Sequence, residues 1–279
     1  MDLTLLGTAA AEGYPALACG CANCETARRR GGRNLRKRSH ALLDGQLLLD
    51  PGPHLLWSVQ QFGLELRRLR HVLLTHGHSD HLLLSNLRFR GPGFVPGELA
   101  PWELCGSAAS LATVAALPEL AELRLTLRPV AAFDTFALGP YTVTALPARH
   151  DPAQSPLFYA IRQDDAALLY ATDSGPWFDE TWAALEDLGR AGVRFGAAVI
   201  EATSGVVERP AGTPPGVHMN FAETIAHARG LRERGLLRPD AAVVAHHFSH
   251  NGAPPHEETA ALLAPAGIVP AYDGMVVTA

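Results

Sequence analysis

Three histidines and one aspartate lie within six consecutive residues of this chain, at His76, His78, Asp80 and His81. Neutral imidazole and carboxylate are the usual protein ligands of zinc and similar divalent ions, so this cluster predicts a metal site. His76 and His78, two residues apart on an extended segment, point to the same side and can hold one ion. Asp80 and His81 follow where we expect the chain to turn into a helix, and they can reach a second ion. The alternative, a polar loop, leaves so dense a set of ligands unexplained.

A catalytic metal centre needs more ligands than one cluster supplies, and three further candidates follow predicted strands. They are His150, Asp173 and His247. Polar residues at the ends of apolar strands are where α/β proteins gather their chemistry. Each of the three could also be an ordinary turn or cap residue, but their common placement favours a shared site.

A second metal site is predicted by three cysteines near the start of the chain, Cys19, Cys21 and Cys24. In a reducing compartment, such crowding suggests a metal rather than disulfides. A structural zinc accepts three cysteines and one histidine, and we expect His250 to be the fourth ligand. His246 is a rival for that place. The alternative is three free cysteines in a reduced loop.

His218 precedes a predicted helix N-terminus, and helix N-termini attract anions. It is therefore a candidate proton donor to a leaving group, or a phosphate ligand. Residues 28–38 carry seven basic side chains, which form either a solvated helix and loop or a surface that contacts phosphate or RNA. Arg88, Arg90 and Arg149 could hold phosphate, although exposed charge is the simpler interpretation of all three.

The elements that must position these residues follow from periodicity and turn signals. Asp44-Gly45 predicts a hairpin, Asp164-Asp165 a second one, and Asn220 with Glu223 a capping box at the start of a helix. Strands come first in hairpins and then alternate with helices, which indicates an α/β layered fold with mixed sheets. Helices are expected at 55–62, directly after Glu65, and at 107–117, 177–190, 220–230 and 257–263. Strands are expected at 3–6, 41–43, 46–49, 70–75, 125–130, 141–146, 157–162, 166–171, 193–200, 241–245 and 275–278.

The composition is ordinary for a globular protein and gives no general attraction to nucleic acid or to an anionic membrane. The chain has 279 residues, 47% of them hydrophobic, and a net charge of -5. That balance gives no general attraction to polyanions. No apolar stretch approaches the roughly 18 residues that span a bilayer, and no signal peptide is recognisable, so we expect a cytoplasmic protein.

The order and spacing of these ligands resemble the metallo-β-lactamase superfamily. The resemblance extends from Leu3 to about His250 and implies an αββα sandwich, in which two mixed sheets are flanked by helices. It further implies one domain over residues 1–279, with a zinc-binding N-terminal loop at about 19–38. The implied ligands are His76, His78 and His150 for one ion, and Asp80, His81 and His247 for the other, with Asp173 between them.

The resemblance also constrains the chemistry. His78 stands where flavodiiron proteins usually carry Glu, which favours hydrolysis over reduction of oxygen or nitric oxide. Asp173 stands where many true β-lactamases have Cys, which argues against antibiotic hydrolysis. Two neighbouring cations, zinc or manganese, would activate a water and offset charge on a phosphoryl oxygen. Asp80 and His218 are the residues on which we expect turnover to depend.

The paired cysteine and histidine motifs are similar to the branch that contains the phosphodiesterase of the carbon–phosphorus lyase pathway. We therefore expect a phosphodiesterase that acts on small or cyclic phosphodiesters. An endonuclease of the tRNA 3′-processing type ranks second, because no flexible arm for tRNA is recognisable, and a thioester hydrolase of the glyoxalase II type ranks third. A protein resembling one from pyrroloquinoline quinone biosynthesis is a non-hydrolytic alternative. The expected partner is a small phosphodiester; a homodimer is kept open, and nucleic acid is not the favoured partner.

Overall fold

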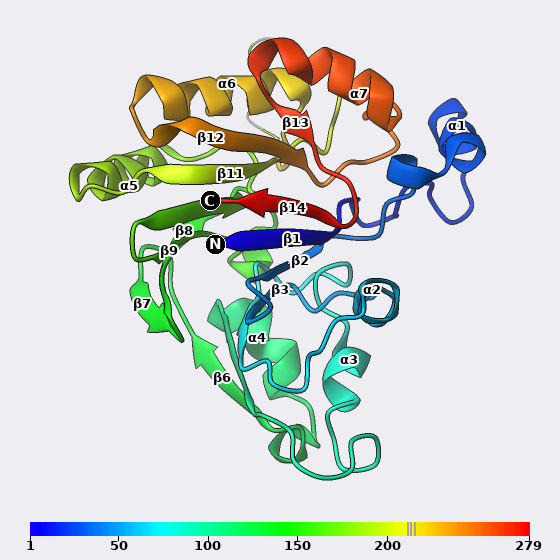
Figure 1. Cartoon of the computed structure of the whole chain (residues 1–279), viewed down its shortest axis with the longest axis vertical. Helices are drawn as coiled ribbons and strands as arrows, with labels where there is room; N and C mark the ends of the chain where they lie inside the picture. The colour runs from blue at the N-terminus through cyan, green and yellow to red at the C-terminus, as the bar shows by residue number, and fades with distance from the viewer. Residues whose placement is uncertain (211, 213, 215) are drawn as a thin grey trace.

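Two β-sheets pack face to face, with helices on the outer side of each, in a computed structural model that describes residues 1–279 except 211, 213 and 215 (Figure 1). This arrangement confirms the predicted αββα sandwich. Each sheet has seven strands among the described residues, and each is part antiparallel and part parallel. The parallel parts matter for function, because the carboxyl ends of parallel strands meet at one edge.

The first sheet has the strand order β14-β1-β2-β3-β4-β5-β6. The pairs from β14 to β3 are antiparallel, and those from β3 to β6 are parallel. Its strands are β1 (Asp2–Gly7), β2 (His40–Leu43), β3 (Leu47–Leu49), β4 (His71–Leu73), β5 (Trp102–Gly106), β6 (Leu125–Pro129) and β14 (Met275–Thr278).

The second sheet has the order β13-β12-β11-β10-β9-β8-β7. The pairs from β7 to β10 are antiparallel and those from β10 to β13 are parallel. Its strands are β7 (Thr135–Leu138), β8 (Tyr141–Pro147), β9 (Leu157–Gln163), β10 (Ala166–Ala171), β11 (Phe195–Glu201), β12 (Leu237–His246) and β13 (Val269–Pro270).

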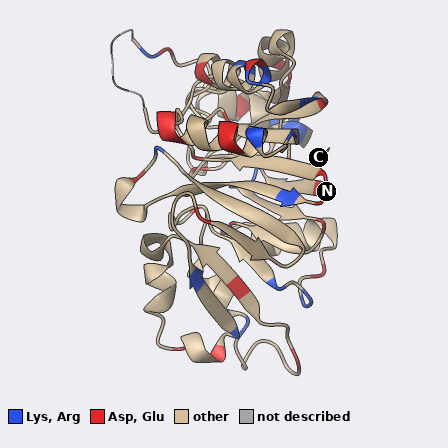
Figure 2. Ribbon diagram, turned by 90° about the vertical axis from the view of Figure 1, so that its left-hand side faces the viewer, with Lys and Arg blue, Asp and Glu red and all other residues tan. Residues whose placement is uncertain are grey.

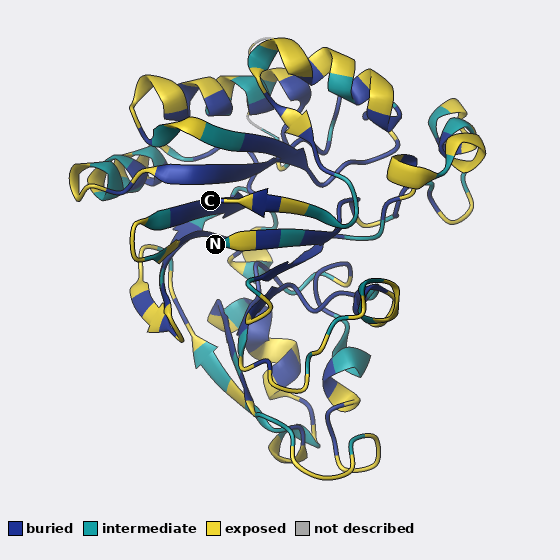
Figure 3. Ribbon diagram, in the orientation of Figure 1, coloured by how far each residue is buried: buried dark blue, intermediate teal, exposed yellow. Residues whose placement is uncertain are grey.

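Helices cover the outer faces of both sheets. Against the first sheet lie α2 (Leu55–Phe62), α3 (Leu84–Arg88) and α4 (Ala108–Ala115), and against the second lie α5 (Asp179–Arg190), α6 (Phe221–Glu233) and α7 (His256–Leu263). The helix α1 (Ala22–Arg30) projects beyond the sandwich near α7 (Figure 1). Every residue of β11 is buried, as expected for an interior parallel strand covered on both faces (Figure 3).

Local sequence signals account for many of these elements. As predicted, the turn at Asp44-Gly45 joins the antiparallel strands β2 and β3, and the turn at Asp164-Asp165 joins β9 and β10. Asn220 and Glu223 form the predicted capping box of α6. The helix expected after Glu65 is wrong, because so few residues separate α2 from β4 that the chain passes through a turn instead. The expectation that Arg90 is exposed is also wrong. Its guanidinium lies 3.9 Å from the centre of the Trp102 ring and donates to the carbonyl of Ala100.

The basic segment at 28–38 is largely engaged with the protein itself. Arg30 forms ion pairs with Glu257 and Glu258 on α7, and Arg36 is buried, where its guanidinium stacks on Phe248. The segment is a helix and loop, as the first interpretation expected, but these charges are paired or buried within the protein rather than solvated, which argues against an RNA surface. Charged residues lie mainly on helices and loops, while the strands carry few (Figure 2). No helix in the described part of the chain combines the length and the apolarity that crossing a bilayer requires.

Candidate metal centre

The seven predicted active-centre ligands converge where strands of both sheets end. The cluster at residues 76–81 follows β4 of the first sheet. His150, Asp173 and His247 follow β8, β10 and β12 of the second sheet. The structure therefore brings the seven together, although they are spread over more than half of the sequence.

One group of ligand atoms consists of His76, His78 and His150. Nδ1 of His78 lies 3.0 Å from Nε2 of His76 and 3.1 Å from Nε2 of His150. Tetrahedral zinc with Zn–N bonds of about 2.0–2.1 Å would separate its ligand nitrogens by about 3.3 Å. The three imidazoles thus present their nitrogens at nearly the spacing that one ion requires.

The second group consists of Asp80, His81, Asp173 and His247, all four buried, with ligand atoms within 4.8 Å of one another. Oδ2 of Asp173 lies 2.9 Å from Nε2 of His81 and 3.6 Å from Nε2 of His76. Its Oδ1 lies 2.9 Å from Nδ1 of His247. Asp173 therefore contacts both groups and has the position of a bridging ligand.

The polar atoms at the middle of this site lack hydrogen-bond partners. Within the described chain, Nε2 of His81, Nε2 of His247 and Oδ1 of Asp173 are buried and have no partner of acceptable geometry. Buried polar atoms are normally satisfied, so each such atom needs an explanation. Ligand atoms that lie within 4.8 Å of one another and lack hydrogen-bond partners fit a divalent cation among them.

Buried carboxylates set the charge balance of the centre. Burial opposes charge, but the carboxylates of Asp80 and Asp50 raise the pKa of His81 well above its usual range. Asp173 likewise outweighs burial and raises the pKa of His247 to about 10. The pKa of Asp173 itself is held well below its usual range by His247 and His81, against the effect of burial. The buried carboxylates of the centre therefore stabilise positive charge placed next to them.

Three residues of the centre have left-handed backbone conformations. They are Asp50, Asp173 and His247, with φ of 60°, 46° and 61°. This region costs a non-glycine residue roughly 1 kcal/mol or more and is concentrated at functional sites. At each position the backbone turns sharply after a strand, which aims the side chain across the sheet edge.

Asp50 is a supporting residue that sequence reasoning missed. Its Oδ2 lies 2.8 Å from Nδ1 of His81, and its Oδ1 accepts a 2.8 Å hydrogen bond from the backbone N–H of Thr75. The bond to Nδ1 leaves Nε2 of His81 with its lone pair toward the centre, the arrangement common to metal-binding histidines. Its position immediately after a buried strand was the available signal.

Glu201 and Thr203 were also missed, and they support His218 and His247. Glu201 is fully buried at the end of β11, and its Oε2 lies 3.1 Å from Nδ1 of His218. The same oxygen accepts a 2.7 Å hydrogen bond from Thr203, whose hydroxyl lies 3.0 Å from Nδ1 of His247. Despite burial, Glu201 raises the pKa of His218. His218 also stands with His150 and Asp173 in a group that could contact an ion.

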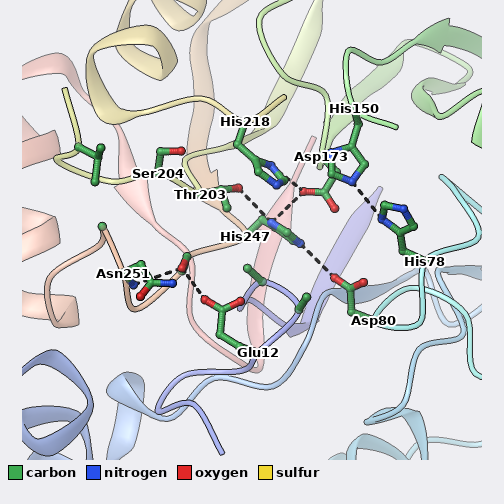
Figure 4. Close-up of a pocket in the computed structure, with 15 residues that line it drawn as sticks. Glu12, His78, Asp80, His150, Asp173, Thr203, Ser204, His218, His247 and Asn251 are labelled. Carbon is green, nitrogen blue, oxygen red and sulfur yellow. Dashed lines mark hydrogen bonds and ion pairs between the residues drawn. The ribbon is translucent and has the colours of Figure 1, made fainter. Parts of the chain in front are cut away.

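A cavity of about 410 Å³ opens onto the centre. Its lining includes His78, Asp80, His150, Asp173, His218 and His247. On the other side of His247, in the close-up, lie Glu12, Ser204 and Asn251 (Figure 4). The volume suits a small molecule or the end of a longer one.

The predicted cysteine site is assembled as well. Nδ1 of His250 lies 3.6 Å from Sγ of Cys19 and 3.5 Å from Sγ of Cys21, and the four ligand atoms, with Cys24, lie within 4.8 Å. Tetrahedral zinc with Zn–S of about 2.3 Å and Zn–N of about 2.0–2.1 Å predicts about 3.6 Å between S and N. His246 lies elsewhere, with Nε2 3.1 Å from the carbonyl oxygen of Gly7.

The start of α1 shapes this cysteine site. Cys21 is the N-cap of the helix, and Cys24 lies in its first turn rather than in a loop. The backbone N–H of Cys24 donates to Sγ of Cys21 and lowers the pKa of that thiol to about 6. A helix N-terminus thus favours the thiolate form, which is the form that binds metals.

Solved structures with this fold include proteins of several activities. A diphosphatase of the PhnP family superposes with a TM-score of 0.73 at 23% identity, covering 100% of this chain and 97% of the other. Zn²⁺-bound PqqB from Methylobacterium extorquens gives 0.73 at 19% identity, with 100% of both chains covered. Human short-form tRNase Z gives 0.65 at 18% identity, covering 100% and 99%. At these identities the likeness concerns the fold.

No curated protein sequence matches the chain. The sequence model of the beta-lactamase superfamily domain, in contrast, matches residues 46–248, which is more than half of the chain and contains the whole active-centre ligand set. Together with the paired seven-stranded sheets, this match shows that the protein belongs to the metallo-β-lactamase superfamily.

Proposed function

We propose that the protein is a dinuclear-metal phosphodiesterase that hydrolyses a small linear or cyclic phosphodiester. The observation that carries the proposal is Asp173, which contacts both groups of ligand atoms beneath a cavity large enough for a small substrate. When bound, two adjacent divalent cations lower the pKa of a water and offset charge on a phosphoryl oxygen. The same ligand chemistry accepts zinc, manganese or iron.

The residues assign the ions as follows. His76, His78 and His150 would hold one, Asp80, His81 and His247 the other, and Asp173 would bridge them. The thiolates of Cys19, Cys21 and Cys24 with His250 would hold a third, structural zinc. We further propose that residues 1–279 act as one domain, because β14 pairs with β1 and the ligands come from both sheets.

His218 is the proposed proton donor. Its Nδ1 faces the carboxylates of Glu201 at 3.1 Å and Asp173 at 3.3 Å, so the proton on Nδ1 has acceptors and Nε2 is left to exchange a proton with substrate. This arrangement orients an imidazole as in other carboxylate–histidine pairs. It also disfavours His218 as a metal ligand through Nδ1, because that role would require the nitrogen facing two carboxylates to lose its proton.

A first experiment tests the reaction class. Protein purified with Mn²⁺ or Zn²⁺ is expected to hydrolyse bis(p-nitrophenyl) phosphate and to contain up to three ions per chain. Replacing Asp80 with Asn should remove turnover while the fold persists. Failure to hydrolyse this ester or any of a panel of cyclic and linear phosphodiesters, in protein that holds both ions, contradicts the proposal.

A second experiment tests His218 alone. p-Nitrophenolate leaves without a proton, whereas an alkoxide needs one. His218→Ala should therefore slow the release of an alkyl alcohol by about 10²–10⁴-fold but slow the release of p-nitrophenol far less. Equal losses with both leaving groups would assign His218 to binding rather than to proton transfer.

The endonuclease alternative has less support. Among the described residues that line the cavity, none is Lys or Arg. A tRNA substrate brings many phosphates, whose contacts usually come from such side chains. A small substrate with few charges fits this lining better.

A further inference from the structure

The cavity has a second wall whose chemistry differs from that of the metal ligands. Glu12, Ser204, Ser249 and Asn251 provide a carboxylate, two hydroxyls and an amide. They come from the loop after β1, the loop after β11 and the loop after β12. Figure 4 shows Glu12, Ser204 and Asn251 on the other side of His247 from His78 and His150. This hydrogen-bonding wall, defined by these four residues, is not used by the proposed hydrolysis.

The hydrogen-bonding wall is held firmly. The hydroxyl of Ser249 donates to Oε1 of Glu12, and the backbone N–H of Asn251 donates to that hydroxyl oxygen at 3.2 Å. The loops after β11 and β12 touch through two glycines. A Cβ on Gly205 would lie 2.1 Å from the carbonyl of Gly252, so no side chain fits between them. Glu12 is therefore positioned by contacts rather than left free in solvent.

The cysteine site also contacts Glu12. Nε2 of His250 lies 3.7 Å from Oε1 of Glu12, while Nδ1 of the same ring faces the thiols of Cys19 and Cys21. The ring thus turns Nδ1 to the thiols and presents Nε2 to the carboxylate. The cysteine–histidine cluster therefore contacts the hydrogen-bonding wall through His250 and Glu12.

Glu12 is the one carboxylate of the hydrogen-bonding wall, and no described residue that lines the cavity is Lys or Arg. Three arginines that adjoin or contact lining residues or their neighbours make contacts of their own. Arg38 donates to the carbonyl of Ala11, and Arg209 pairs with Glu223 at 2.8 Å. Arg149 stacks on Phe178, 4.0 Å from the ring centre. With no ammonium or guanidinium group beside it among the described residues of the cavity lining, this carboxylate can accept hydrogen bonds from neutral donors and repels a second anion.

We infer that Glu12 determines substrate specificity, and that the natural substrate is a phosphodiester with a hydroxyl-bearing, sugar-like flank and no second phosphate on that flank. The inference rests on the proposed phosphodiesterase activity and names its substrate class. The metal centre would take the diester, and Glu12 with its neighbours would accept hydrogen bonds from the hydroxyls. A site built to bond a hydroxyl discriminates strongly against an analogue that lacks it.

The test uses three chromogenic esters that differ only in the sugar. They are uridine 5′-(p-nitrophenyl phosphate), its 2′,3′-dideoxy analogue and its 3′-phosphate derivative. The native enzyme should favour the first over each of the others by about 10-fold or more in kcat/KM, the loss expected for a hydrogen bond to a charged group. Glu12→Gln should collapse the preference over the 3′-phosphate most, because the repulsion is removed.

Binding measurements give a readout independent of turnover. Calorimetric titration with uridine 5′-phosphate and its dideoxy analogue should show the same preference in the native protein and its loss in Glu12→Ala. The matched control is Glu25→Gln, a solvent-exposed carboxylate paired with Arg28 on α1, which should retain native selectivity. Metal content and melting temperature of each variant show whether it is folded.

The outcomes separate the two proposals. No hydrolysis of bis(p-nitrophenyl) phosphate or of the three esters contradicts the phosphodiesterase itself. Hydrolysis of all three at equal efficiency, or a preference that Glu12→Gln and Glu12→Ala both leave intact in folded protein, overturns the role of Glu12 while the reaction class stands. A preference for the 3′-phosphate ester overturns the inferred substrate class.

Discussion

Replacing Asp50 with Asn tests whether a residue that touches no substrate sets the chemistry of the centre. The side chain keeps its shape but loses its charge, and one of its oxygens becomes an amide that donates. In the native site both oxygens accept, one from Nδ1 of His81 and one from the backbone N–H of Thr75, each at 2.8 Å. Either orientation of the amide therefore places a donor against a donor, unless His81 changes tautomer.

The consequence for His81 can be followed from its ring. If the amide nitrogen of the substituted side chain faces Nδ1 of His81, the amide donates and Nδ1 must accept the hydrogen bond. The ring proton then moves to Nε2, which faces Asp173 and the centre. A protonated Nε2 cannot bind a cation. Losing a hydrogen bond to a charged group costs about 1.5–3 kcal/mol, which corresponds to roughly 10–150-fold. We therefore expect metal affinity and turnover to fall by about 10–100-fold, in the range found for such supporting residues.

The assay is competition for the metal against a chromogenic chelator, together with hydrolysis of bis(p-nitrophenyl) phosphate. Asp240→Asn is the matched control, because this aspartate is exposed on β12 and its nearest cation, Arg238, is 3.9 Å away. Thermal melting separates loss of the fold from loss of the metal. Native affinity and native turnover in folded Asp50→Asn would refute the reasoning, since His81 would then not depend on Asp50.

Three further outcomes are expected. Asp80→Asn should lower turnover by at least about 10²-fold while the melting temperature changes little, because the variant weakens the binding of one of the two active-centre ions. Elemental analysis should then show fewer ions per chain. Cys21→Ser should lower the melting temperature and remove one zinc per chain, since structural zinc contributes directly to folding, whereas Cys105→Ala should leave the zinc content unchanged. Gly52→Ala places a Cβ 2.4 Å from the carbonyl oxygen of Asp80 and should lower the free energy of unfolding in urea by about 1–3 kcal/mol. Its control is Gly93→Ala, which has open space around the new Cβ and should lower the free energy of unfolding by less than about 0.5 kcal/mol. Equal stability of the two glycine variants would contradict the packing argument.

The ligand cluster at residues 76–81 could be identified from sequence because its meaning is local. Several ligand types in one short run need no knowledge of the fold. His150, Asp173 and His247 could be proposed because each follows an apolar strand, and the structure brings them to the cluster. Which histidine of the pair 246–247 faces the centre depends on the backbone turn after β12, where His247 takes a positive φ.

The supporting residues were not predicted, because their roles arise from tertiary contacts. Asp50 acts on His81 across two strands, and Glu201 acts on His218 across a loop. Each lies at or directly after the end of an apolar strand, but nothing in the sequence indicates which histidine it contacts. Glu12 is harder still, since its importance comes from the loops that surround it. The helix wrongly expected after Glu65 had suitable composition, but the short path from α2 to β4 leaves no room for it.

The pairing of β1 with β14 has a consequence for how the protein forms. Asp2 lies opposite Thr278, so the first sheet is completed only when two segments that are far apart in the sequence meet. Such distant partners slow folding, and until they join, the edge of β1 is a template for pairing with other chains. Deleting residues 275–279 should therefore promote aggregation during expression, even though the deletion lies outside the catalytic cavity.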